Sequence, residues 1–66
     1  MRKIYRISVF NRERKMRELT WMTYASRKKA QAMADAMNDV DDDNIVDAKV
    51  VVEVRDKGQL IERKTL

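Results

Sequence analysis

A chain of 66 residues with a net charge of +4 has room for one small domain, spanning residues 1–66, and buries only about 60% of its unfolded surface. The sequence has no Cys and no His, which excludes disulfides, thiolate nucleophiles, the usual near-neutral base and the commonest metal ligands. No apolar run approaches the length of about 20 residues that crosses a bilayer, and no signal peptide is recognisable, so a cytoplasmic protein is expected.

The first third of the chain predicts two strands joined by a hairpin loop. Residues 4–10 alternate between apolar and polar side chains, which is typical of a strand with one buried face. Residues 11–15 are polar and form the expected loop. Residues 16–24 are rich in Trp, Tyr and Thr, which favour strands.

Residues 27–38 predict a helix. Ser26 is a suitable N-cap, because its hydroxyl can accept a hydrogen bond from a free backbone N–H of the first turn. Asn38 or Asp39 ends the helix. Helical spacing places four apolar residues in one stripe, namely Ala30, Met33, Ala34 and Met37. The first turn is cationic and the last turn and its exit are acidic, so both ends oppose the helix macrodipole.

A second pair of strands is predicted after the helix. Residues 45–55 carry five apolar residues at alternate positions, namely Val46, Ala48, Val50, Val52 and Val54. The only glycine, Gly58, lies in the turn at residues 56–59. Residues 60–66 form a weaker strand whose register stays open. A two-residue turn places Ile61 opposite Val54, whereas a three-residue turn places Leu60 there.

The order ββαββ predicts an α+β fold, with a four-stranded antiparallel sheet in the strand order 2-1-3-4 and one helix packed on one face. The other face is then expected to be open, and its mixture of basic, aromatic and apolar side chains is that of a recognition surface or of an ordinary solvated face. The residues assigned to this open face are Arg6, Ser8, Phe10, Thr20, Met22, Tyr24, Lys49, Val51, Glu53 and Arg55.

The modest net charge conceals a division of the chain. Residues 1–32 contain ten cationic and two acidic residues and carry +8, whereas residues 33–66 contain five cationic and nine acidic residues and carry −4. Either the two halves interleave in the fold and their charges mix, or the segregated charges face a charged partner.

The segregated charges supply the candidate contact residues. The cations are in the hairpin loop and its flank and at the start of the helix, and the acids follow the helix: Arg12, Arg14, Lys15, Arg17, Arg27, Lys28, Lys29, Asp41, Asp42 and Asp43. The spacing of the aspartates suggests a calcium loop, but position six is Asn44 rather than Gly and position twelve is Val50 rather than Glu. No catalytic, cofactor-binding or metal-binding residue is predicted.

The segment from Ser26 to Ala34, read as a Ser-capped, Ala-rich basic helix between two hairpins, resembles the small phage-encoded anti-defence proteins of the anti-CRISPR type. The resemblance implies a non-enzymatic protein that inhibits or modulates a host nucleic-acid-handling or defence complex through charged contacts. Two alternatives come from the charges themselves: direct nucleic-acid binding by the basic N-terminal half, and a homo-oligomeric structural protein.

Overall fold

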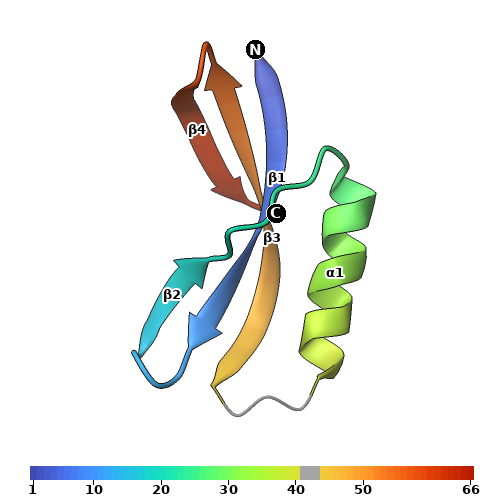
Figure 1. The fold of residues 1–66 in the computed structure, drawn as a ribbon, viewed down its shortest axis with the longest axis vertical. Coiled ribbons are helices and arrows are strands. Elements are labelled where there is room, and N and C mark those ends of the chain that lie inside the picture. The colour runs from blue at the N-terminus through green and yellow to red at the C-terminus, as the bar shows by residue number, and fades with distance from the viewer. Residues whose placement is uncertain (41–43) are drawn as a thin grey trace.

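The computed structural model describes residues 1–40 and 44–66. Five elements follow one another in the order ββαββ, as predicted: β1 (Arg2–Asn11), β2 (Met16–Leu19), α1 (Arg27–Asp39), β3 (Ile45–Asp56) and β4 (Gln59–Thr65). The four strands form one antiparallel sheet in the order β2-β1-β3-β4, and α1 packs on one face of it (Figure 1). The predicted fold class is therefore confirmed.

The two hairpins lie at opposite ends of a long central pair of strands. β2 pairs only with the end of β1, from Ser8 to Asn11, and β4 pairs only with the second half of β3. The sheet is curled, and β2 and β4 border opposite edges of the central pair at opposite ends of the molecule (Figure 1). One half of the helix-bearing face is therefore bordered by β2 and the other half by β4.

The second predicted strand is shorter than expected, and its faces were wrongly assigned. β2 ends at Leu19, which lies opposite Ser8 and so shares the face turned away from α1. Tyr24 instead exchanges two backbone hydrogen bonds of 2.8 Å with Tyr5 and packs against the core under the helix. The alternation predicted across residues 16–24 fails because the chain leaves the regular ladder after β2.

Both hairpin turns are explained by local chemistry. The side chain of Asn11 accepts hydrogen bonds from the backbone N–H groups of Glu13 and Arg14, which closes the first turn. Lys57 and Gly58 both have positive φ, 52° and 83°, as a two-residue hairpin of the mirror-image type requires. The second turn therefore has two residues, one of the two registers left open by the sequence.

Two irregularities in the sheet change the predicted side-chain pattern. Asp47 has a φ of 55° and lies in an irregularity of the β1–β3 ladder that places Val46 opposite Phe10, so Val46 does not share the face of the later valines. A second irregularity, at Ile61, places Glu62 opposite Val54. Neither Leu60 nor Ile61 reaches the core, since their exposed fractions are 43% and 57%.

The helix is too short to cover the face on which it packs. Its 13 residues span about 20 Å at 1.5 Å per residue, whereas the 12 residues of β3 span about 40 Å. Ala30 and Ala34 are fully buried against the sheet, but Met33 of the predicted apolar stripe is 37% exposed. Ser26 occupies the N-cap position without a side-chain cap hydrogen bond, so the predicted capping bond is not formed.

The covered half of the face holds the main core, which consists of Ile7, Val9, Ala30, Ala34, Ala48 and Val50. Asn38 ties the end of α1 to this core: its amide donates to the carbonyl of Ala48 at 3.1 Å and accepts from the backbone N–H of Ala48 at 2.8 Å. Within the described part of the chain, no helix is long and apolar enough to cross a membrane.

Candidate functional site

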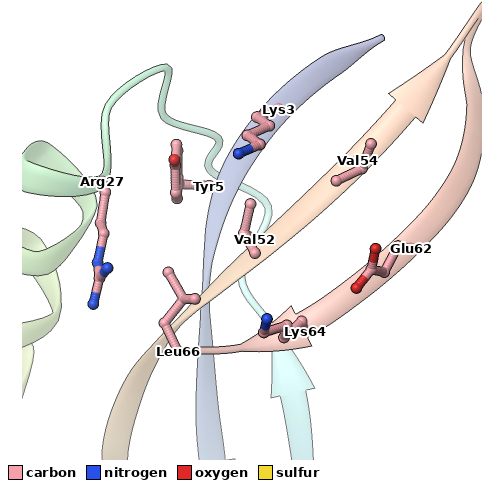
Figure 2. Close-up of a pocket in the computed structure, with 8 residues that line it drawn as sticks. All are labelled: Lys3, Tyr5, Arg27, Val52, Val54, Glu62, Lys64 and Leu66. Carbon is pink, nitrogen blue, oxygen red and sulfur yellow. The ribbon is translucent and has the colours of Figure 1, made fainter.

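A groove of about 270 Å³ occupies the half of the helix-bearing face that α1 leaves uncovered (Figure 2). Its floor is apolar and consists of Tyr5, Val52, Val54 and Leu66. The first three side chains are half-buried, because β1 and β3 continue beyond the start of the helix. The groove is thus a direct result of the difference in length between the helix and the central strands.

Charged side chains form the rim of this groove. Lys3 comes from β1, Arg27 is the first residue of α1, and Glu62 and Lys64 come from β4 (Figure 2). All four residues are exposed. None of the three cations forms an ion pair with any residue between 1 and 40 or between 44 and 66. The rim therefore has an excess of positive charge that the described part of the chain does not neutralise.

On the opposite face of the sheet, the arginines form ion pairs within the chain. Glu53 is only 1% exposed and lies at the centre of three arginines. Arg63 donates to Oε2 of Glu53 through Nε at 2.8 Å and Nη2 at 2.6 Å. Arg55 donates to Oε1 at 3.4 Å, and Arg6 lies 3.7 Å from the same oxygen. The face predicted to be open is therefore partly closed by these long side chains on a curled sheet.

The charge state of Glu53 follows from these contacts. Burial raises the pKa of this carboxyl, but the hydrogen bond from Arg63 and the positive charges of Arg6, Arg63 and Arg55 outweigh burial and hold the pKa below its ordinary value. Glu53 is thus ionised at neutral pH, and its carboxylate is a shared ionic partner of the three arginines.

A second structural ion pair lies on the same face. Arg17 donates through Nη1 to the hydroxyl of Ser8 at 2.9 Å and to the carbonyl of Asp47 at 3.1 Å, and its Nη2 pairs with the carboxylate of Asp47. These bonds link β2 to the irregular start of β3. Arg17, predicted as a contact residue, is consequently occupied within the chain.

The other predicted cations form two groups, one at the β1–β2 turn and one at the start of α1. Arg12, Arg14 and Lys15 are exposed at the β1–β2 turn, where Arg14 pairs with Glu18 at 3.2 Å. The backbone of Arg12 donates to the carbonyl of Asn44 at 2.7 Å, which puts this turn beside the start of β3.

The remaining predicted cations lie far from that turn. The first turn of α1, which contains Arg27, Lys28 and Lys29, lies at the end of the helix away from the β1–β2 turn (Figure 1). Of these three residues, only Arg27 lines the groove. Asp41, Asp42 and Asp43 lie outside the described residues. The structure therefore does not gather the predicted cations into one surface.

Sequence reasoning did not find Lys3, Glu62 and Lys64. Lys3 has the same parity as Tyr5 along β1, which would have placed it on the helix-bearing face. The positions of Glu62 and Lys64 depend on the irregularity at Ile61, for which the sequence carries no signal.

A second exposed surface surrounds Trp21, which is 86% exposed. It includes Leu19 and Met22 next to Met37 of the helix. Its one acidic residue, Glu18, is already paired with Arg14. This surface offers apolar area but no free charge that would identify a ligand.

No family model matches this chain, and neither the curated proteins nor the solved structures contain a significant match to it. Among the described residues, no group of three or more acidic side chains is arranged to hold a metal ion. The groove is therefore the feature of this chain that bears most directly on its function.

Proposed function

We propose that this protein is a non-enzymatic binding protein that captures an acidic, partly apolar segment of a partner protein in the groove. The observation that carries the proposal is the combination of an apolar floor with Lys3, Arg27 and Lys64, which have no ionic partner in the described chain. Carboxylates of the segment would pair with the rim, and its apolar side chains would cover the floor.

The composition of the floor favours a protein segment over nucleic acid. Single strands bind through phosphate contacts together with stacking of successive bases on aromatic rings. The floor has one aromatic ring, Tyr5, and its other residues are the aliphatic Val52, Val54 and Leu66. Aliphatic side chains are covered well by the apolar side chains of a peptide but provide no platform for bases.

The wider role that we propose is inhibition or modulation of a host nucleic-acid-handling or defence complex. Its support is the resemblance of the sequence to small phage-encoded anti-defence proteins, together with the exposed cations of the groove. Direct nucleic-acid binding is the second candidate, because Arg12 and Lys15 are exposed and have no ionic partner among the described residues.

The test measures fluorescence anisotropy of labelled probes at two salt concentrations. The probes are a twelve-residue peptide of alternating Glu and Leu, the same peptide with Lys for Glu, and a twelve-nucleotide single strand. The groove variant combines Lys3→Glu with Arg27→Glu, the two rim cations outside β4. The control variant combines Arg12→Glu with Lys15→Glu, which changes the net charge by the same amount at the other end of the molecule.

We expect the wild type to bind the Glu–Leu peptide and the groove variant to bind it at least about tenfold more weakly, a loss of about 1.4 kcal/mol. The control variant should retain its affinity within about twofold. Equal weakening in both variants, or no peptide binding at low salt, overturns the proposal. Binding of the single strand in preference to the peptide supports the second candidate instead.

A further inference from the structure

β4 is an unprotected edge of the sheet. It lies at one end of the strand order, and among the described elements it contacts only β3. All of its residues are exposed, and the chain here carries three exposed apolar residues, namely Leu60, Ile61 and Leu66. An exposed edge with apolar side chains is a template for the addition of another strand.

The backbone groups that face outward can be identified. The N–H of Leu66 donates to the carbonyl of Val50 at 2.9 Å, so residues 50 and 66 form a hydrogen-bonded pair of the antiparallel ladder. Because hydrogen-bonded and non-hydrogen-bonded pairs alternate, Glu62 and Lys64 direct their backbone groups towards β3. The backbone groups of Arg63 and Thr65 therefore point away from the sheet.

We propose that a second copy of this chain pairs with β4 in an antiparallel arrangement centred on Arg63. This register joins outward backbone groups to outward backbone groups and places Glu62 of each copy opposite Lys64 of the other. Each of the three registers centred on Glu62, Arg63 or Lys64 places one pair of like charges directly opposite each other, which is destabilising. Only the register centred on Arg63 adds two pairs of opposite charges, Glu62 with Lys64, which favours it over the other two.

The two Arg63 side chains that meet at the centre do not prevent this pairing. Each is on the face turned away from α1, and each is held by Glu53 of its own copy through bonds of 2.6 and 2.8 Å.

The charges of β4 also explain why a second copy is the preferred occupant. Charged residues on an edge strand usually block the addition of other strands. When the run Glu62-Arg63-Lys64 is reversed, its two outer residues face residues of opposite charge, an arrangement that most other strands do not offer.

The symmetry of the β4–β4 pairing determines the relative orientation of the two copies. A two-fold axis perpendicular to the sheet puts both helices and both grooves on the same side of an eight-stranded sheet. Glu62 and Lys64 belong both to the groove rim and to β4, but the pairing does not rest on the proposed function of the groove, because Lys3 and Arg27, which test that function, are not part of β4.

The absence of native cysteines makes the register directly testable. Glu62→Cys and Lys64→Cys are made separately, mixed in equal amounts and oxidised. In the Arg63-centred register, Cα atoms of opposite residues 62 and 64 are about 4.5 Å apart, within disulfide reach, whereas two residues 62 are about 8 Å apart. We expect the mixed 62–64 dimer to dominate over both homodimers. Dominance of a 62–62 or 64–64 dimer, or no disulfide dimer, overturns the proposal.

Sedimentation equilibrium tests the charge pairing in the unmodified chain. The wild type should be a dimer, Lys64→Glu should be monomeric because Glu62 then faces another acid, and the exchanged variant Glu62→Lys with Lys64→Glu should be dimeric again. Circular dichroism checks that each variant is folded. A monomeric wild type, or an exchanged variant no more dimeric than Lys64→Glu alone, also overturns the proposal.

Discussion

On the face turned away from the helix, four arginines are paired with the carboxylates of Glu53 and Asp47, whereas on the helix-bearing face the three cations of the groove have no ionic partner among the described residues. The difference has a geometric origin. The curled sheet brings long side chains of β1, β2, β3 and β4 together on its open face, but the short helix leaves Lys3, Arg27 and Lys64 around a groove. Similar residues thus hold the fold together on one face and remain available for binding on the other.

Exposure of a cation in a small protein is therefore not enough to assign it to a ligand. Arg17 is 36% exposed in its side chain, yet it donates to Ser8 and Asp47 and so joins two strands. Lys3 and Lys64, which sequence analysis passed over, have no such contacts and line a groove. The network of hydrogen bonds, rather than the charge count, separates the two groups.

The largest expected change in the free energy of unfolding comes from Glu53, on the face where the arginines are paired. Glu53→Gln leaves three arginines without their buried carboxylate and should lower the free energy of unfolding by on the order of 3 kcal/mol. Urea denaturation at pH 7 measures the change. Glu13→Gln, at an exposed position in the first turn, is the control and should change stability by less than about 0.5 kcal/mol. A loss below about 1 kcal/mol in Glu53→Gln would show that the cluster does not hold the curl of the sheet.

The tie between α1 and β3 should have the next largest effect. Asn38→Ala removes both hydrogen bonds to the buried backbone of Ala48 and should cost about 2 kcal/mol of stability. Gln31→Ala, on the exposed side of the same helix, serves as the control. Because the groove begins at the other end of α1, Asn38→Ala should weaken peptide binding less than the groove variant does. Thermal unfolding and anisotropy together check this expectation.

Low pH should weaken the ion pairs between Glu53 and its three arginines. The pKa of Glu53 lies below its ordinary value of 4.5 in the folded protein, so the ionised carboxylate stabilises the fold above pH 4.5. That stability is lost as the pH falls through the lowered pKa. We expect the difference in unfolding free energy between the wild type and Glu53→Gln to shrink below pH 4.5, as measured by urea denaturation at several pH values. A difference that stays constant down to pH 2 contradicts this assignment.

The smallest effect on stability is expected on the groove side. Lys3→Ala combined with Arg27→Ala should change the free energy of unfolding by no more than about 0.5 kcal/mol, because neither side chain has an ionic partner in the described chain. Urea denaturation beside the Glu53→Gln variant gives the comparison directly. A loss of more than about 1 kcal/mol would mean that these cations also serve the fold.

Much of the fold follows from local patterns. Alternation in residues 4–10 and 45–55, helical spacing after Ser26 and the single glycine of the second turn predicted the order and type of the elements. The irregularities at Asp47 and Ile61 were not predictable, because each depends on how one strand fits another rather than on its own composition. They reversed the expected faces of Val46 and moved Glu62 opposite Val54.

The candidate site was predictable only in part. Of the predicted cations, Arg27 lines the groove, whereas Arg17 is bound within the chain and Arg12 lies at the far turn. The sequence by itself determined the ββαββ order, the confinement to one short helix and the excess of positive charge. Tertiary structure decided which cations remain unpaired, because ion pairs such as Arg63–Glu53 form between strands whose register and curvature arise only when the sheet is assembled.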